Sequence, residues 1–574
     1  MFSRQLGFAL TLAFCGMSGV SERSQAFAAA PTLTQFYPVA IPSGATTTVN
    51  AVGKFEPWPP EVWTDAPGIT LEAGKKSGEF TVTVATDVAP GPHLVRLFNA
   101  TGVSVPRFLV VTAEADVPEK EPNDHYGKAP MVAVMPVTMQ GRLGKSGDVD
   151  SYAVELAAGQ TLIAAVEANI LASPVDAVLR LVDTRGVELA LNHDRGRSLD
   201  PFLTWTAKSA GTYILQIFGF AQPATADVRF TGSDACVYRL YLSAGPQVRH
   251  VLPLGIQRDQ PARRRIAGWN LGAWGEREFE LERLRFAADA PHATWLDPDL
   301  GQAIAVPVGD GPEWMERDIQ ARAADAPALT APFAITASIA QTGEEDRFRF
   351  SVTKGEKLVL QIKSAALGFP LDAWLAIENL AGKELVRNDD GSGADPVLEW
   401  TAPETGNFFA IVGSVLHRAG SDHLYRLSFE RTVPRFSGVV ADAGFTVEPG
   451  KTAKVKVIAR RVQGFKAKLT ATWVGLPEGV TANPAQVGES DKDVTLELVA
   501  ATGAEPFMGP VELQFQEEGS EVVHPGLFEL VSTTLNNGVP QGFRELVIPA
   551  TKKLWLTVLA ASPGKDPVAE KPAP

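Results

Sequence analysis

Residues 173–217 read SPVDAVLRLVDTRGVELALNHDRGRSLDPFLTWTAKSAGTYILQI, and residues 369–412 read FPLDAWLAIENLAGKELVRNDDGSGADPVLEWTAPETGNFFAIV. The two stretches share turn formers, carboxylates and one tryptophan at matching positions. The matched pairs are Asp176 and Asp372, Gly186 and Gly382, Asn192 and Asn388, Asp194 and Asp390, Asp200 and Asp395, Pro201 and Pro396, Trp205 and Trp400, and Gly211 and Gly406. A module that occurs twice in one chain indicates an array of domains, so the function has to be explained for the array as a whole.

Short alternating segments on both sides of these stretches indicate strands. One example places Phe80, Val82 and Val84 on one face of a strand and threonines on the other, with turns following. With 51 glycines and 42 prolines, the chain favours many short strands joined by turns over long helices. We therefore predict an all-β fold, a tandem array of β-sandwich domains that are jelly-roll-like or immunoglobulin-like.

A chain of 574 residues is too long for a single core, and about four or five domains are expected. The expected units are a signal peptide (1–28), an immunoglobulin-like domain (31–113, the first domain), the first copy of the repeated sandwich (114–244), an intervening β domain (245–325), the second copy (326–433), another immunoglobulin-like domain (434–560, the last domain) and a disordered tail (561–574). The tail has too few apolar residues to form a core.

The first 28 residues have the pattern of a secretory signal. A basic start at Arg4 precedes an apolar run over residues 6–14, and small residues predict cleavage after Ala28. The alternative is lipoprotein processing before Cys15, which the bulky Phe14 disfavours. No later run of 18 apolar residues occurs, so no transmembrane segment is expected. The protein is expected to be secreted, periplasmic or at the cell surface.

The charge balance of the chain is acidic. Its formal net charge is −14 at pH 7, and no basic stripe offsets it. Such a surface repels phosphate backbones, so nucleic acid is not an expected partner. Acidity fits the binding of divalent cations instead.

The strongest chemical signal is a set of acidic residues at the start of the first copy. The candidate ligands are Glu119, Glu121, Asn123, Asp124, Asp148 and Asp150. The first four belong to one extended and then bent segment, and the last two are same-face neighbours at the start of a strand. If the segment lies across that strand, five carboxylates and an amide converge, and Ca²⁺, which binds hard oxygen ligands, would neutralise their repulsion. The alternative is a solvated acidic linker that precedes a domain.

The order of motifs in the first copy resembles the bacterial pre-peptidase C-terminal domain. The motifs are EPND at 121–124, GDVDSY at 147–152, a loop with Asp176, a DxxG turn at 183–186, NHD at 192–194 and AGTYILQI at 210–217. Members of that family are β-sandwiches attached to secreted peptidases and to many other surface proteins, and its collagenase members bind collagen and calcium. The resemblance covers about 125 residues, and it implies that the same six residues are calcium ligands here.

The second copy departs from the family pattern. It keeps GEEDRF at 343–348, but ADAPALTAPFAI at 324–335 stands where an acidic segment is expected. Because the segment's donors are missing, we predict one calcium site, in the first copy only.

The other repeated residues are interpreted as structural. Asp176 and Asp372 follow a proline and begin a strand, where a turn cap is favoured over a metal ligand. Asn192, Asp194, Asp200 and their partners sit in a loop rich in Asp and Gly, and such loops are explained by Asx turns more often than by bound metal. Trp205 and Trp400 each follow a leucine by two residues, so both should point into a core.

The search for a catalytic motif finds none. No HExxH motif occurs, the eight histidines are scattered, and Cys236, the only cysteine after the signal, has no evident histidine partner. Two tryptophan pairs, Trp58 with Trp63 and Trp269 with Trp274, could form a platform for sugar rings or peptides, or could fill domain cores and seams.

We therefore predict a non-catalytic, secreted, multidomain binding or adhesion protein that recognises an extracellular protein or polysaccharide, with calcium stabilising the first copy. One alternative is a structural surface or scaffold protein without such a ligand. Another is a secreted hydrolase or a peptidase-associated subunit. The sequence does not choose the ligand or the oligomeric state.

Overall fold

The structure is a computed structural model, and nearly all of its regular structure is strand. It describes residues 29–195, 198–222, 224–226, 228–260, 263–276, 278–280, 292–296, 303–319, 328–390, 395–531 and 546–561. The all-β prediction of tandem sandwich domains is confirmed. The expected signal peptide and residues 562–574 of the expected tail lie outside the described residues. Within the described ranges, no helix has the length and apolar character needed to cross a membrane.

The first domain is a sandwich of two sheets. One sheet has the order β1 (Thr32–Tyr37), β3 (Thr46–Lys54), β6 (Glu79–Val84), β5 (Ile69–Ala73). The other has the order β2 (Ala40–Pro42), β9 (Arg107–Thr112), β7 (Gly91–Asn99), β4 (Glu61–Thr64), and β8 (Gly102–Val103) pairs with β7. Phe80, Val82 and Val84 are buried in its core, as their alternation predicted. Trp58 packs against the same core and donates its indole N–H to the Gly74 carbonyl at 3.0 Å.

The two copies are sandwiches with the same strand order. One sheet of the first copy has the order β10 (Val117–Pro118), β11 (Val137–Arg142), β18 (Val237–Ser243), β13 (Thr161–Glu167), β16 (Phe202–Thr206). Its other sheet has the order β12 (Asp150–Leu156), β17 (Gly211–Ala221), β14 (Val175–Val182), β15 (Glu188–Asn192). In the second copy, one sheet has the order β25 (Glu313–Met315), β26 (Phe333–Ser338), β33 (Leu424–Arg431), β28 (Lys357–Lys363), β31 (Val397–Thr401). The other has the order β27 (Glu345–Val352), β32 (Gly406–Ser414), β29 (Ala373–Asn379), β30 (Glu384–Asn388). Trp205 and Trp400 pack against the cores of their copies, as predicted. Cys236 is buried and free.

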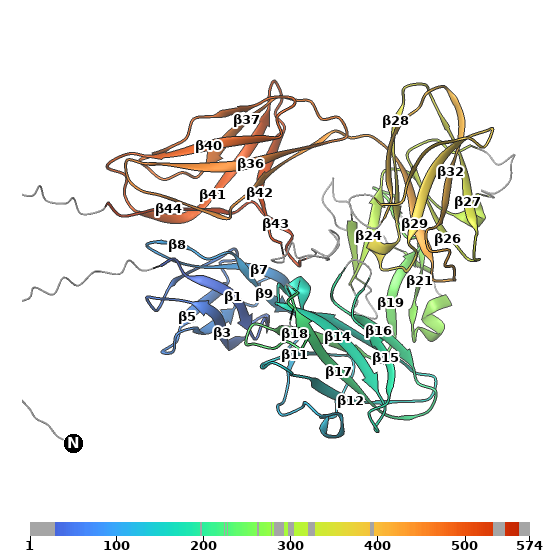
Figure 1. The fold of residues 1–574 in the computed structure, drawn as a ribbon, viewed down its shortest axis with the longest axis horizontal. Helices are drawn as coiled ribbons and strands as arrows, with labels where there is room; N and C mark the ends of the chain where they lie inside the picture. Colours follow the sequence, from blue (N-terminus) through green and yellow to red (C-terminus); the bar gives the residue numbers. More distant parts are fainter. Residues whose placement is uncertain are drawn as a thin grey trace, which may run out of the picture.

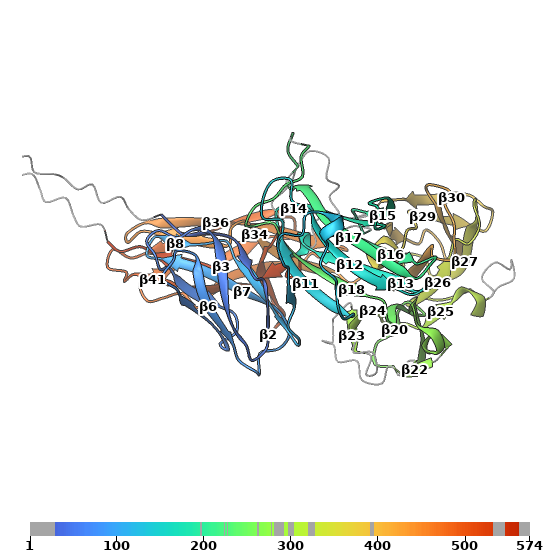
Figure 2. The ribbon, with the colours of Figure 1, turned by 90° about the horizontal axis from the view of Figure 1, so that it is seen from below.

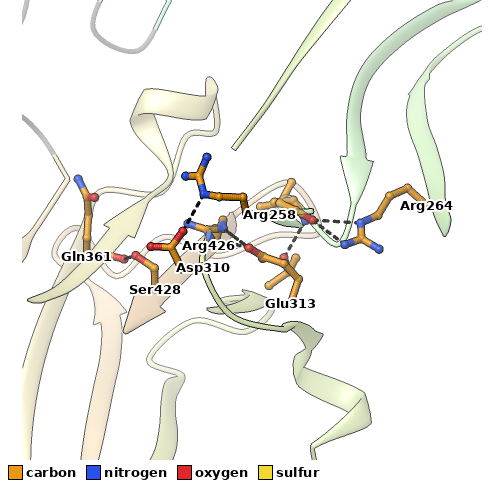
Figure 3. A network of polar contacts seen from close by, with 10 residues as sticks. Arg258, Arg264, Asp310, Glu313, Gln361, Arg426 and Ser428 are labelled. Atoms are coloured by element: carbon orange, nitrogen blue, oxygen red, sulfur yellow. Dashed lines mark hydrogen bonds and ion pairs between the residues drawn. The ribbon is translucent and has the colours of Figure 1, made fainter. Parts of the chain in front are cut away.

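Each copy starts with a short strand that pairs in parallel with the next one, β10 with β11 and β25 with β26. An ion pair ties this first strand to the central strand of the sheet. Asp116 lies 2.6 Å from Arg239 in the first copy, and Glu313 lies 2.6 Å from Arg426 in the second (Figure 3). The expected boundary at residue 326 is therefore too late, because the sheet of the second copy already includes Glu313. β25 was missed because three residues are too few to show an alternating pattern.

A short 3₁₀ turn recurs in both copies, η2 (Asn169–Leu171) and η5 (Ala365–Leu367). Asp200 accepts hydrogen bonds from the backbone N–H groups of residues 168, 169 and 170, at 2.6–3.0 Å. Asp395 does the same for residues 364, 365 and 366. The interpretation of these two repeated aspartates as structural residues is therefore confirmed. Each one supplies the acceptor that the exposed N–H groups at the start of a helical turn require.

The intervening domain consists of two small sheets. One has the order β19 (Gln247–Leu252), β21 (Arg263–Trp269), β22 (Glu278–Glu280), and the other β20 (Ile256–Gln257), β24 (Ala303–Gly309), β23 (His292–Leu296). The other 3₁₀ turns among the described residues are η1 (Tyr126–Lys128), η3 (Gly272–Glu276) and η4 (Glu316–Asp318). Trp269 lies at the joint with the first copy, 5.2 Å from the ring of Phe202, and the guanidinium of Arg249 lies over its ring. The side chain of Trp274 lies outside the described part of the structure.

The strands of the last domain are all linked by pairing. Its strands form one continuous sheet in the order β35 (Gly444–Val447), β44 (Leu554–Val558), β41 (Phe507–Glu517), β42 (Val523–Glu529), β34 (Arg435–Val440), β36 (Thr452–Val462), β40 (Asp493–Ala500), β38 (Val480–Thr481). Three further strands, β37 (Leu469–Val474), β39 (Ala485–Val487) and β43 (Ala550–Thr551), pair off this path. The two faces are joined because the long strand β41 pairs with β37, β42 and β44.

The two ends of the array meet. The last domain, orange in Figure 1, lies beside the first domain, blue, and in Figure 2, seen from below, the first domain lies in front of the last. The terminal contact is formed by Trp63, Leu94, Arg96 and Phe98 of the first domain with Leu530, Leu546 and Trp555 of the last. η2 of the first copy also touches both domains. The chain therefore closes on itself, and Trp63 lies in a seam between domains.

Candidate metal centre

The acidic segment of the first copy lies across the start of β12, as the sequence suggested. The N–H of Glu119 donates to the Gln140 carbonyl at 2.9 Å, which extends the pairing of β10 with β11. Further along, the carbonyl of Asn123 accepts from the N–H of Ser151 in β12 at 3.1 Å. These two backbone bonds hold the segment against β11 and against the start of β12, which begins at Asp150 two residues after Asp148.

Three carboxylates form the outer part of the centre. Side-chain oxygens of Glu121, Asp124 and Asp148 all lie within 4.8 Å of one another. Asp148 is 1% exposed, and its Oδ2 accepts from the N–H of Gly144 at 2.6 Å. Its Oδ1 is buried without a hydrogen bond, and Lys145 Nζ lies 3.6 Å away. The same Nζ lies 2.9 Å from Asp124 and lowers the pKa of that carboxyl, whereas burial raises the pKa of Asp148.

The amide of Asn123 joins the outer part to the inner part. It is fully buried, and its oxygen faces Asp150 Oδ1 and Glu121 Oε2, while its nitrogen faces only donors. When the amide is turned over, its nitrogen lies 2.9 Å from both carboxylate oxygens and donates to each. With the nitrogen turned inward, the amide donates to both carboxylates and bridges the outer and inner parts without a cation. With the oxygen inward, a cation between the three acceptors would be required.

Two buried carboxyls and a tyrosine form the inner part. Tyr238 donates to Asp150 Oδ2 at 2.6 Å and also lies 3.2 Å from Glu119 Oε2. Tyr152 contacts the Tyr238 hydroxyl at 2.6 Å, and Tyr37 of the first domain lies 3.4 Å from Glu119 Oε1. Burial, helped by the charge of Glu119, raises the pKa of Asp150 to about 9, and burial also raises the pKa of Glu119.

The structure thus brings all six predicted residues together, in two layers. Glu121, Asp124 and Asp148 offer oxygens at the outside, Asn123 and Asp150 lie behind them, and Glu119 is committed to hydrogen bonds with tyrosines and with the backbone N–H of Arg142. The donor set is oxygen only, which fits Ca²⁺. The tyrosines were missed because Tyr152 and Tyr238 are part of ordinary strand alternation, and nothing near Tyr37 in sequence signals the centre.

The second copy keeps more of this set than the sequence suggested. The register of β25 places Glu316 and Asp318 at the positions of Glu119 and Glu121. Asp346 accepts from Tyr425 at 2.6 Å, as Asp150 does from Tyr238. Glu344 accepts from the N–H of residue 340, as Asp148 does from that of residue 144.

The expectation that the second copy lacks an acidic segment was therefore wrong, because the segment lies at 313–318 and not at 324–335. By the same spacing, Gln320 and Ala321 take the places of Asn123 and Asp124. These two positions lie outside the described residues. The second copy thus has carboxylates at four of the matching positions, Glu316, Asp318, Glu344 and Asp346, and it has no asparagine at the position of Asn123.

The raised pKa of Asp150 predicts how stability depends on pH without metal. The folded state holds a proton on this carboxyl up to about pH 9, whereas the unfolded chain releases it near 3.8. Folding therefore takes up a proton between these values, and stability should fall as pH rises from 5 to 9. Glu119 and Asp148 act in the same direction.

Melting temperatures measured in chelator from pH 5 to 9 check this. The variant Asp150→Asn should show a flatter profile, and Glu188→Gln, an exposed change in the same copy, should keep the original slope. A profile that rises with pH would contradict the prediction.

Comparisons with protein-family models and with curated proteins found no match. Among solved structures, Escherichia coli alpha-2-macroglobulin activated by porcine elastase is 8% identical, with 92% of this chain and 53% of that chain covered and a TM-score of 0.13. The chain therefore spans about half the length of that protein. The D0-D1 domain of intimin is 9% identical, with 34% and 94% covered and a TM-score of 0.12. An S-layer protein is 10% identical, with 88% and 54% covered and a TM-score of 0.13. Likenesses this weak carry no argument about function.

Proposed function

We propose that a calcium ion binds at the start of the first copy, held by Glu121, Asn123, Asp124, Asp148 and Asp150. The observation that carries this proposal is the convergence of Glu121, Asp124 and Asp148, whose side-chain oxygens all lie within 4.8 Å of one another. The buried Oδ1 of Asp148, which has no hydrogen bond, supports it independently. A cation at this position supplies the positive charge that Lys145 gives only at the rim of the cluster.

The proposed ion would fix the joint between the first domain and the first copy. Glu119, in the same segment, contacts Tyr37 of the first domain. Next to it, Gln140 exchanges two hydrogen bonds of 3.3 Å with the backbone of Ala40. An ion that fixes the acidic segment would therefore also fix the residues that contact the first domain. Because calcium would bind the folded protein and not the unfolded chain, its binding would raise the free energy of unfolding.

At the level of the whole chain, we propose a non-catalytic, secreted scaffold at the cell surface. The secretory pattern of residues 1–28 and the acidic, all-β array support this role. The resemblance of the copies to pre-peptidase C-terminal domains supports it too. The aromatic platform needed for recognition of a polysaccharide or matrix protein has less support, because Trp58 lies in a core and Trp63 and Trp269 lie in seams. The structure therefore favours the scaffold over ligand recognition through these residues.

Calcium titration of the full chain tests the proposed site. Calcium at about 100 times its dissociation constant should stabilise the first copy by about 2.7 kcal/mol, seen as a higher melting temperature. Asp148→Asn should remove most of the response, and Glu188→Gln should keep it. Terbium luminescence, sensitised by the nearby tyrosines, gives a second readout. If calcium leaves the melting temperature and the hydrogen exchange of residues 119–124 unchanged, the proposal fails.

The variant Asn123→Asp separates the two orientations of the amide. If the Asn123 oxygen binds calcium, a carboxylate at this position keeps calcium binding and destabilises only the metal-free protein. If the amide nitrogen instead donates to Asp150 and Glu121, the variant destabilises the protein equally with and without calcium. The melting temperatures of the variant in calcium and in chelator, each compared with the unmodified chain, decide between them.

A further inference from the structure

The outer face of one sheet of the first domain is apolar. Trp63 in β4 and Arg96 in β7 are cross-strand partners, and Leu94 and Phe98 point to the same side of β7 as Arg96. In an isolated sandwich this face would be exposed to water, since the opposite side of the sheet already covers the core. Here the last domain covers it.

The terminal contact has the composition of a protein–protein interface. The ring of Trp555 lies 6.0 Å from that of Trp63 and 4.8 Å from that of Phe98. Leu94 packs with Leu530 and Leu546 of the last domain. Tryptophan and arginine surrounded by apolar residues are the residues that dominate binding energy between separate proteins.

Arg96 makes this contact specific. It is fully buried, and its Nη2 donates to the Lys553 carbonyl at 2.8 Å while its guanidinium faces Trp555. Its Nε and Nη1 have no hydrogen-bond partner, and burial lowers its pKa to about 10. Within the described part of the chain, no carboxylate pairs with it. A buried charge without a partner makes the terminal contact less stable than an apolar contact of equal area would be. The first and last domains can therefore separate at a lower cost in free energy.

Apart from the terminal contact, the last domain packs against η2 of the first copy and is connected to the second copy. It follows the second copy through residues 432–434, where Val433 is half exposed. Among the described residues, no apolar cluster includes side chains from both the second copy and the last domain. Rotation about this connection would break the terminal contact and the contact with η2, and it would leave the separate cores of the first and last domains intact.

We propose that the terminal contact also forms between two copies of this chain, with the first domain of one against the last domain of the next. The two halves of the contact are different surfaces, so the association is head-to-tail, and it can continue from chain to chain or close into a ring. Closure within one chain competes with it, because the two surfaces of a single chain are held at a high effective concentration, on the order of millimolar. Association between chains should therefore grow with protein concentration. This inference goes beyond the proposed function and does not depend on calcium.

Complementation between two full-length variants tests the inference. Leu94→Asp disables the surface on the first domain, and Leu530→Asp disables the surface on the last domain, so neither variant can close on itself or pair with its own kind. An equimolar mixture retains one intact pair of surfaces. It should form a species of twice the monomer mass by light scattering, and each variant alone should stay monomeric with a larger hydrodynamic radius than the unmodified chain.

Controls keep the outcome interpretable. Val105→Asp and Val523→Asp change exposed residues of the same two domains and should leave the closed monomer intact. Circular dichroism checks that each variant folds, and the pair Phe98→Asp and Leu546→Asp replaces a variant that does not. A mixture that remains monomeric although both variants are folded and open overturns the proposal.

Discussion

Replacing Arg426 by methionine should destabilise the second copy by about 3–5 kcal/mol, the usual cost of leaving a buried charge without its partner. Its side chain is 2% exposed, and that of Glu313 is 1% exposed. Both Nε and Nη2 of Arg426 bind the carboxylate, at 3.1 Å and 2.6 Å (Figure 3). The change removes the only cation that binds this carboxylate among the described residues, and it removes the ion pair that ties β25 to β33. Hydrogen exchange of β26 and β33 in the full chain would measure the loss.

The double variant Arg426→Met with Glu313→Leu is the control for this prediction. Because it removes both charges, it should recover most of the lost stability. The matched change Arg239→Met in the first copy should cost less, since Arg239 is 13% exposed and water reaches Asp116 more easily when the arginine is lost. A loss below about 1 kcal/mol for Arg426→Met would show that the pair contributes little.

The second large effect is expected for Asp200→Ala, at about 3 kcal/mol. The side chain is buried and accepts three backbone hydrogen bonds at the start of η2. Its loss leaves three N–H groups without an acceptor, and each unsatisfied buried donor costs about 1–3 kcal/mol before the turn relaxes. η2 is also a place where the first copy touches both the first and the last domain. The Leu171 carbonyl accepts from Gln35, and the Ile170 carbonyl accepts from the N–H of Val547.

Asp395→Ala is the matched variant in the second copy, where the same cap holds η5. Both variants should raise hydrogen exchange in their own turn. Only Asp200→Ala should also raise exchange in β9 and around residue 547, because only η2 lies between the first and last domains. Equal effects of both variants on the first domain would contradict this assignment.

The strands were predictable because local alternation decides which residues face a core. Phe80, Val82 and Val84 are buried as their spacing indicated, and the repeated aspartates at 200 and 395 cap the same turn in both copies. Duplication made the prediction stronger, since a residue kept at both positions of one chain has the same structural role twice.

The relative placement of domains was not predictable from local pattern. Trp63 and Trp555 are 492 positions apart in the sequence, and no periodicity records that their rings meet. β25 was missed for a related reason, since a strand of three residues is defined by its pairing with β26 and by the Glu313–Arg426 ion pair.

The candidate centre was predicted in part. Spacing alone identified the six oxygen-bearing side chains that the structure brings together. It did not separate the outer carboxylates from Glu119 and Asp150, because that division depends on Tyr238, which comes from a strand 88 residues after Asp150.

The terminal contact has a consequence for the newly made chain. Arg96 and the Lys553 carbonyl it binds are 457 residues apart. At about 5–20 residues per second, the first domain is complete on the order of a minute before the last domain is made. During that interval the apolar face around Phe98 has no cover, and neighbouring nascent chains could adhere there. A chaperone that shields this face until translation ends would raise the yield of folded protein.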